Sequence, residues 1–259
     1  MCNVRIVSKA ARRYDFVVNP PAVATDARWN PLLRIASAAA LMSAVFIPIQ
    51  IAVFLLWPPP LDGTAADWFG LLQDNRLAGL IDLDLLLVAD NVLLIPILLA
   101  LFLALRRARE SMMLIASALG FTSAVMYIAS NPAIQLATLS DQYASATTDA
   151  ERHTFSAAGE SMLAQWQGTG FHVAYLCGSA AGILIGAVML QSGVFTRLTG
   201  WLGVAANALG LGLYIPKVGV YVAVFSVLFL EVWYVLVALR LNRMALGSSD
   251  PATGVQKAA

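Results

Sequence analysis

Long apolar runs alternate with short polar segments along this chain, and the alternation predicts its elements. Six runs approach the about 20 mostly apolar residues that a helix needs to cross the roughly 30 Å hydrocarbon layer of a bilayer. The predicted spans cover residues 32–57, 80–105, 112–130, 171–190, 198–215 and 218–239. The pattern therefore predicts an all-α, polytopic membrane protein, folded as a bundle of six transmembrane helices.

Composition supports the same class. Of the 259 residues, 59% are hydrophobic and 12% are charged, and the mean hydropathy is +0.75. A soluble domain averages about 45–50% apolar and roughly 25% charged residues, so one buried core cannot absorb this excess. We therefore expect the lipid bilayer to contact much of the surface. The net charge of +1 argues against a nucleic-acid partner.

The positive charges sort onto one side of the six-span arrangement. On that side lie 13 of the 16 basic residues, and only Arg76, Arg152 and Lys217 are left for the other. The positive-inside rule then predicts that both termini are cytoplasmic in a plasma (inner) membrane protein. We expect a basic tail over residues 1–30, a transmembrane domain over 31–244 and a disordered tail over 245–259.

Two polar segments fall on the predicted outer side. The first, residues 58–79, has room for a short interfacial helix. In the second, residues 131–170, Thr148 and Glu151 form a capping-box pattern. Apolar residues then recur at helical spacing as far as Trp166, which predicts an amphipathic helix over the outer mouth or on the outer leaflet. The alternative is a surface helix that only connects two spans.

Glycines at regular spacing mark two of the spans as packing elements. The candidate packing residues are Gly178, Gly182, Gly186, Gly203 and Gly210. Small residues at such spacing let helix backbones approach closely in lipid, where hydrophobicity alone gives no preference between partners. We favour packing inside the bundle over a homodimer face, and both remain open.

Polar side chains gather near the outer ends of the predicted spans. The candidate ligand-binding residues are Asp90, Asn91, Gln50, His172, Tyr175, Tyr127, Asp84 and Lys217. Asp82 and Asp84 are expected at the outer interface, with Lys217 as a cationic partner for one or the other. Asp90 lies deeper and should face the bundle interior, because a charge in the bilayer centre costs at least about 2.5–3.5 kcal/mol. The alternative is a hydrogen-bond network between helices without chemistry, which we favour for His172.

Catalytic patterns are not found. The sequence has no glycine-rich phosphate loop, nucleophile elbow or H-E-x-x-H motif. Only His153 and His172 are histidines, and a metal site that joins them to Asp90 is an alternative we do not favour. Cys2 and Cys177 suggest neither a disulfide nor a metal site. We expect no catalytic residue, metal or cofactor.

Three stretches resemble a bacterial family of six-span integral membrane proteins known as "domain of unknown function 4386". They are "LSDQYASATTDAERHTFSAAGESMLAQWQGTGFHVAYLCGSAAGILIGAVML", "SGVFTRLTGWLGVAANALGLGLYIP" and "VFSVLFLEVWYVLVALRL". The likeness runs from about residue 30 to residue 243. Glu231 stands where an apolar or aromatic residue is expected. The resemblance implies a bacterial membrane protein and supplies no substrate or catalytic residue.

The sequence thus predicts a membrane protein with an outward-facing polar pocket that binds or passes a small molecule or ion. A non-catalytic regulatory or assembly protein, packing as a homo-oligomer or against partner membrane proteins, is the alternative. A lipid-modifying intramembrane enzyme is the third interpretation.

Overall fold

The computed structural model describes residues 26–247, and every regular element among them is a helix. Most of the two predicted tails, 1–30 and 245–259, lies outside this range. The described chain forms two compact units. Unit 1 comprises residues 26–44, 93–121 and 178–247, and unit 2 comprises residues 45–92 and 122–177. Three long helices, α2, α5 and α8, contribute to both units.

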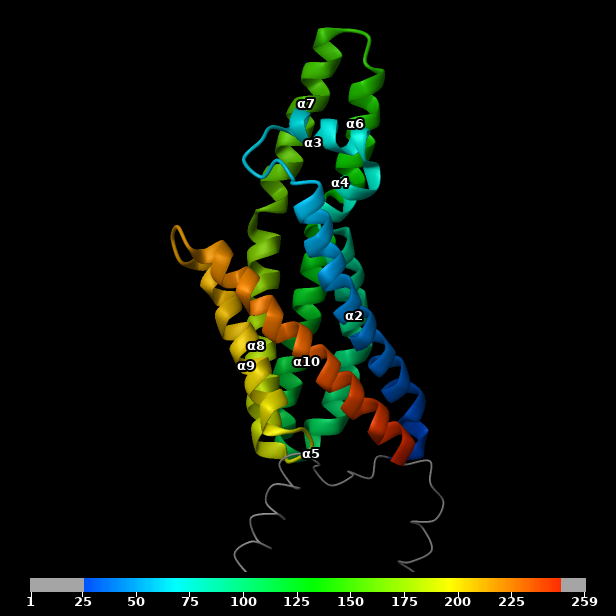
Figure 1. Ribbon diagram of the computed structural model, residues 1–259, viewed down its shortest axis with the longest axis vertical. Coiled ribbons are helices and arrows are strands. Elements are labelled where there is room, and N and C mark those ends of the chain that lie inside the picture. Colours follow the sequence, from blue (N-terminus) through cyan, green and yellow to red (C-terminus); the bar gives the residue numbers. More distant parts are fainter. Residues whose placement is uncertain (1–25, 248–259) are drawn as a thin grey trace, which may run out of the picture. The chain divides into compact units, whose positions relative to one another are not determined.

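The elements follow one another closely along the chain (Figure 1). In order they are η1 (Ala27–Trp29), α2 (Asn30–Leu56), α3 (Ala65–Asp74), α4 (Arg76–Asp82), α5 (Leu85–Ser130), α6 (Ala133–Ser145), α7 (Asp149–Trp166), α8 (Thr169–Ser192), α9 (Arg197–Gly210), η2 (Leu211–Tyr214) and α10 (Gly219–Gly247).

Four helical stretches of the described chain are long and apolar enough to cross a membrane. They are Ala27–Leu56, Leu85–Ser145, Asp149–Ser192 and Tyr221–Gly247. This number and composition indicate a multi-pass membrane protein.

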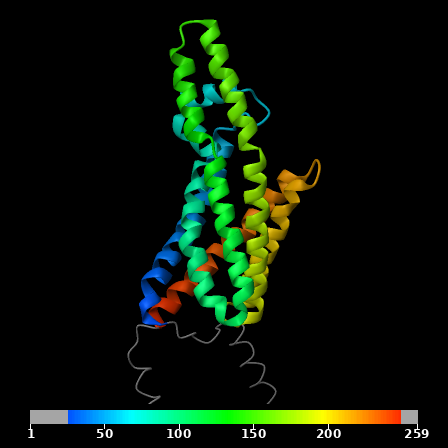
Figure 2. The same ribbon diagram turned by 180° about the vertical axis from the view of Figure 1, so that it is seen from behind.

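The stretch Leu85–Ser145 contains a chain reversal. Within α5, Arg109 has non-helical dihedral angles, φ −154° and ψ 78°. Figures 1 and 2 show two antiparallel arms of α5 that meet at this turn. The arms pack closely, because a Cβ on Gly120 would lie 2.7 Å from Cδ1 of Leu98. The predicted spans 80–105 and 112–130 therefore correspond to the two arms.

The start of the predicted span 80–105 needs correction. The helix is broken at Leu83 and Asp84, so α4 ends at Asp82 and the long helix begins at Leu85. Asp84 has φ 65° and ψ 24°, a left-handed conformation that stops a right-handed helix. The other predicted spans match helices, although α10 continues to Gly247, eight residues beyond the predicted end at 239.

Unit 1 uses its glycines for packing inside the chain. A Cβ on Gly182 of α8 would overlap the side chain of Asn207 on α9. A Cβ on Gly186 would lie 2.9 Å from the carbonyl oxygen of Gly200 on α9. A Cβ on Gly203 of α9 would lie 2.8 Å from Nε1 of Trp233 on α10 and 3.6 Å from Cα of Gly186 on α8. These small residues let α8, α9 and α10 approach closely.

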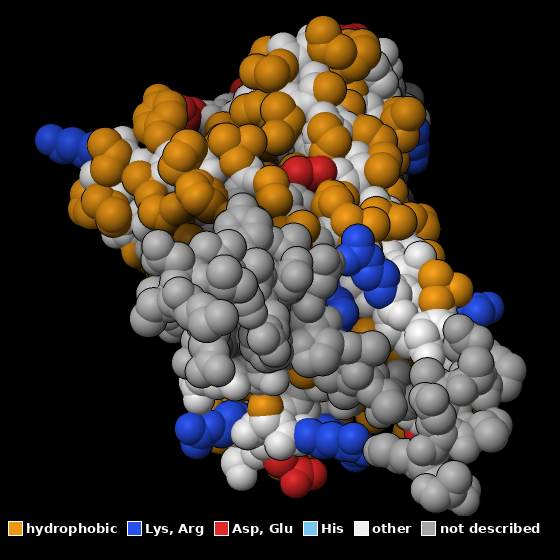
Figure 3. All heavy atoms as spheres, turned by 60° about the horizontal axis from the view of Figure 1, so that its bottom comes forward, with side chains coloured by type: hydrophobic (Ala, Val, Ile, Leu, Met, Phe, Trp, Pro, Cys, Tyr) orange, Lys and Arg blue, Asp and Glu red, His pale blue; other side chains and the backbone are white. Residues whose placement is uncertain are grey.

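The α5 turn, the α8–α9 link and the end of α10 lie at one end of unit 1 (Figures 1 and 2). Figure 3 looks onto this end and shows Lys and Arg side chains around it. The sequence places Arg106, Arg107, Arg109, Arg197, Arg240 and Arg243 in these segments. Arg109 donates to Oε1 of Gln191 at 3.2 Å, and Arg240 donates to the carbonyl of Val194 at 2.7 Å.

Unit 2 has a hydrophobic cluster of its own, built from helices α3 and α6 and from Leu83, with α7 packed against it. Its members are Ala65, Trp68, Phe69, Leu72, Leu83, Ala133, Leu136 and Ala137, with Met162, Leu163 and Trp166 packed against them. The rings of Trp68 and Trp166 meet edge to face at 5.7 Å. The predicted helix after Thr148 is confirmed as α7, with its capping box, and it contributes to this cluster.

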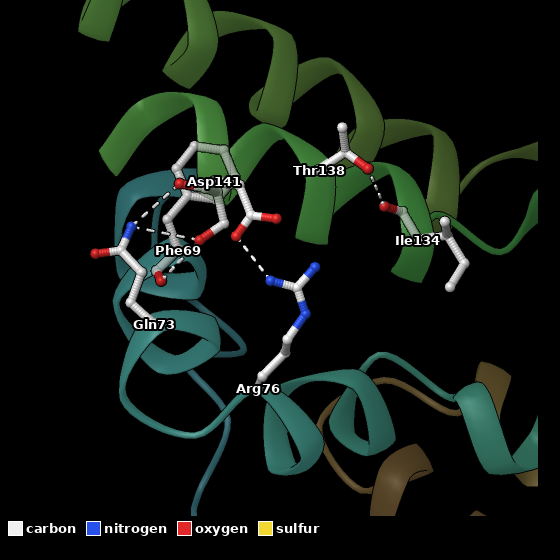
Figure 4. Close-up of polar contacts among 7 residues, drawn as sticks. Phe69, Gln73, Arg76, Ile134, Thr138 and Asp141 are labelled. Carbon is white, nitrogen blue, oxygen red and sulfur yellow. Dashed lines mark hydrogen bonds and ion pairs between the residues drawn. The ribbon is translucent and has the colours of Figure 1, made fainter. Parts of the chain in front are cut away.

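Polar contacts also join the short helices of unit 2 (Figure 4). Arg76 of α4 pairs with Asp141 of α6 at 2.7 Å. Ser140 donates to the carbonyl of Phe69 at 3.2 Å and accepts from Gln73 at 3.3 Å. The sequence did not predict α6, because much of its buried side is alanine and serine, which give a weak apolar signal.

Candidate functional site

The break between α4 and α5 is the centre of the candidate site, and side chains from other segments of unit 2 hold it in place. Gln50 of α2 donates from Nε2 to the carbonyl of Ile81 at 2.8 Å. Asn131, directly after α5, donates from Nδ2 to the carbonyl of Leu83 at 2.7 Å. The carbonyl of Ile81 also accepts from the backbone N–H of Asp84 at 2.9 Å, so the two side chains add further hydrogen bonds to carbonyl groups at the break.

Asp84 lies at the N-terminal end of α5 and accepts side-chain hydrogen bonds from Tyr127 and Trp166. It therefore links the start of α5 to the end of the same helix and to the end of α7. Burial is the main influence and raises the pKa of Asp84 to about 6; the two donors oppose this shift and the nearby Asp82 adds to it.

Asp82 is the most unusual group of the site. Its residue is only 3% exposed, and neither carboxyl oxygen has a hydrogen-bond partner among the described residues. Burial raises its pKa to about 6. Its predicted position at the outer interface stays a prediction, and the structure adds that protein encloses the side chain. Its neighbour Leu83 is buried in the hydrophobic cluster of unit 2, which carries this part of the chain inside.

Gln50 provides a further buried acceptor at the same place. Its Nε2 atom is bonded to the carbonyl of Ile81, the residue before Asp82, while its Oε1 atom is buried without a partner among the described residues. Three oxygen acceptors, two on Asp82 and one on Gln50, thus lie near the break without a donor. The ion pairs Arg76–Asp141 and Arg152–Asp149 of unit 2 involve neither Asp82 nor Asp84.

Tyr127, Tyr175 and His172 belong to an aromatic group around Phe171. The rings of Phe171 and Tyr175 stack at 5.7 Å, Tyr127 meets Phe171 at 6.4 Å, and His172 meets it edge to face at 5.5 Å. His172 is exposed. Tyr127 connects this aromatic group to the break through its hydrogen bond to Asp84.

The remaining predicted site residues have different positions. Asn91 donates from Nδ2 to the carbonyl of Leu87 in its own helix, at 2.8 Å. Asp90 is half-buried and close enough to Tyr127 to act on it electrostatically. Lys217 belongs to unit 1, where it has a left-handed φ of 71°. Its predicted pairing with Asp82 or Asp84 stays a prediction.

Comparisons with known proteins give no relative to guide the assignment. No family model, curated protein or solved structure matches the chain. The resemblance to a family of six-span proteins stays a prediction, and the site has to be interpreted from its own geometry.

Sequence reasoning missed two residues of the site. Trp166 was predicted only as part of an apolar helix face, and Asn131 was not singled out. A signal existed for Trp166, because a buried indole N–H usually requires an acceptor and the sequence offers few carboxylates nearby. For Asn131 the sequence pattern Asn-Pro indicates a helix boundary but not which carbonyl the amide reaches.

The arrangement is rich in acceptors and poor in donors. Two carboxylates interact electrostatically in a buried setting, and an unpaired buried carboxylate is costly unless it is protonated or meets a cation. Among the described residues, no group of three or more His, Cys, Asp or Glu side chains is arranged to hold a metal ion. The chemistry that fits is reversible binding of a positively charged group.

Proposed function

We propose that this chain is a six-span membrane protein whose outward-facing half binds a small cation at the α4–α5 break. The two arms of α5 separate at Arg109, and α9 with η2 extends over residues 197–214, which supports two spans beyond the four long stretches. The arginines at one end of unit 1 support cytoplasmic termini under the positive-inside rule.

One observation carries the binding proposal: Asp82 is buried, and both its carboxyl oxygens lack a hydrogen-bond donor among the described residues. Leaving such a group unpaired costs about 1–3 kcal/mol, and more when it is charged. A cation removes this cost by giving the carboxylate a partner. Broken helices that place acceptors inside a membrane protein are a recurring way to build cation sites.

The glycine faces do not favour the alternative of an assembly protein. Gly182, Gly186 and Gly203 face side chains or backbone of the same chain. A glycine already in contact within the bundle is not free to meet a second membrane protein.

Thermal unfolding of the full chain in lipid nanodiscs tests the proposal. Sodium, potassium and ammonium chlorides are each compared with tetraethylammonium chloride at equal ionic strength and pH 7.5. Ligand at ten times its Kd stabilises the folded state by about 1.4 kcal/mol, so at least one small cation should raise the midpoint. The rise should persist in Asp62→Asn, an exposed loop control, and disappear in Asp82→Asn. Equal responses of all three proteins, or no response, would contradict cation binding.

A further inference from the structure

We propose that the cation bound at the α4–α5 break is a primary ammonium group, carried by a small alkylamine. This inference rests on the proposed function and specifies its ligand. The acceptors without donors are Oδ1 and Oδ2 of Asp82 and Oε1 of Gln50. A primary ammonium group has three N–H donors and no acceptor. The number of donors thus matches the number of acceptors.

The rest of the break explains why these oxygens are the ones available. The amide nitrogen of Gln50 is bonded to the carbonyl of Ile81, which fixes the side chain with Oε1 left over. The carbonyl of Leu83 is taken by Asn131. Asp84 already accepts from Tyr127 and Trp166, and it adds a second negative charge close to Asp82.

A metal cation fits this arrangement less well. Hard cations such as Ca²⁺ take six to eight oxygen ligands, and Mg²⁺ demands near-ideal octahedral geometry. No group of three or more metal-binding side chains occurs among the described residues. An ammonium group needs only directional acceptors, and hydrogen bonds between ionised partners are among the strongest that proteins form.

The surroundings also suit the carbon end of an amine. Leu83, between the two aspartates in the chain, is fully buried, and Asp84 accepts hydrogen bonds from the aromatic residues Tyr127 and Trp166. Trp68 packs edge to face on Trp166. Apolar and aromatic residues next to the break accept the carbon of an alkylammonium group, and aromatic rings attract its charge.

A series of cations with different numbers of N–H donors distinguishes binding of a primary ammonium group from binding of an alkali-metal ion. The wild-type chain in nanodiscs is titrated at pH 7.5 with methylammonium, trimethylammonium, tetramethylammonium and sodium chlorides, which offer three, one, no and no N–H donors, and the unfolding midpoint is recorded. Alkylamines of this kind are protonated at this pH, like lysine with its pKa of about 10.4. We expect half-maximal stabilisation by methylammonium at a concentration at least ten-fold below that of sodium, and none by tetramethylammonium.

A glutamine variant tests the third acceptor. Gln50→Leu should raise the half-maximal methylammonium concentration about ten-fold, since it removes one hydrogen bond to a charged group. Gln135→Leu, at an exposed position on α6, is the matched control and should leave it unchanged. The cation titrations use the wild-type protein, so they test the inference even if Gln50→Leu does not fold.

The outcomes are distinguishable. Stabilisation by sodium at concentrations equal to or below those of methylammonium overturns the ammonium inference and leaves cation binding standing. Equal effects of methylammonium and tetramethylammonium overturn it as well, because donors would then not matter. No stabilisation by any cation removes the proposed function itself.

Discussion

At the scale of single residues, Asp82 and Asp84 differ in their hydrogen-bond donors. Both are influenced by burial, and the pKa of each is raised to about 6. Asp84 has two side-chain donors, whereas Asp82 has none among the described residues. The chain therefore stabilises one carboxylate with its own groups and leaves the other in need of a proton or an external cation.

These shifts predict how stability varies with pH. The pKa of both groups is higher in the folded chain, about 6, than the ordinary value of 3.8, so the unfolded chain releases these protons at lower pH. Their contribution to the free energy of unfolding therefore falls as the pH rises from about 4 to about 6.

Asp82→Asn should weaken this fall and, without small cations at pH 7.5, raise the free energy of unfolding by about 1–3 kcal/mol. Denaturant unfolding in mild detergent between pH 4.5 and 7.5 measures both effects, with Asp62→Asn as control. An unchanged pH dependence in Asp82→Asn would show that Asp82 does not carry a buried charge.

Sequence reasoning at this scale identified polar residues but not their partners. Gln50, Asp84 and Tyr127 were predicted at one level, and the structure brings all three into unit 2. Asn91 was predicted beside them, yet its amide is bonded within its own helix. The partner of a polar side chain depends on tertiary contacts, and a helical repeat alone does not encode them.

At the scale of elements, the close approach of α8 and α9 predicts that adding a methyl group between them lowers the stability of the chain. Gly182→Ala places a methyl group on the Asn207 side chain and should destabilise the chain by about 1–3 kcal/mol. Thermal unfolding in nanodiscs measures it. Gly70→Ala in α3 is the control, because a Cβ there has no neighbour within 4 Å and alanine favours a helix. Equal stability of the two variants would argue against tight α8–α9 packing.

The cluster of unit 2 gives a second prediction at this scale. Trp68, a member of the cluster, is only 1% exposed. Trp68→Ala should lower the free energy of unfolding by about 3–5 kcal/mol. Hydrogen exchange of α6 and α7 amides should accelerate as the cluster loosens. The control is Trp201→Ala in α9, whose side chain is 61% exposed and should have little effect. Unchanged exchange in α6 and α7 after Trp68→Ala would mean that these helices do not depend on the cluster.

Long apolar runs made most helices predictable, because a span needs a minimum number of apolar residues and α2, α8 and α10 have them. The break after α4 was not predictable in this way. A single left-handed residue at Asp84 interrupts an apolar run without changing its composition. The short helix α6 was missed because tertiary packing, rather than its own apolar repeat, stabilises it.

Topology belongs to the scale of the whole molecule. The six-span proposal places both termini inside and the α6–α7 link outside, so single cysteines should differ in access. With Cys2 and Cys177 replaced by serine, Ser145→Cys at the end of α6 should react with a membrane-impermeant maleimide in intact cells. Gly247→Cys at the end of α10 should react only after permeabilisation. Labelling of both sites from the same side would contradict this topology.

The central claim, that Asp82 accepts a small cation, is tested most directly by perfusion-induced infrared difference spectroscopy of the full chain in lipid. Buffer containing tetraethylammonium chloride is exchanged at pH 7.5 for one containing sodium, potassium and ammonium chlorides. The account predicts a carboxylate difference band that is present in wild type and in Asp62→Asn and absent in Asp82→Asn. A spectrum without a carboxylate band, or the same band in Asp82→Asn, would contradict it.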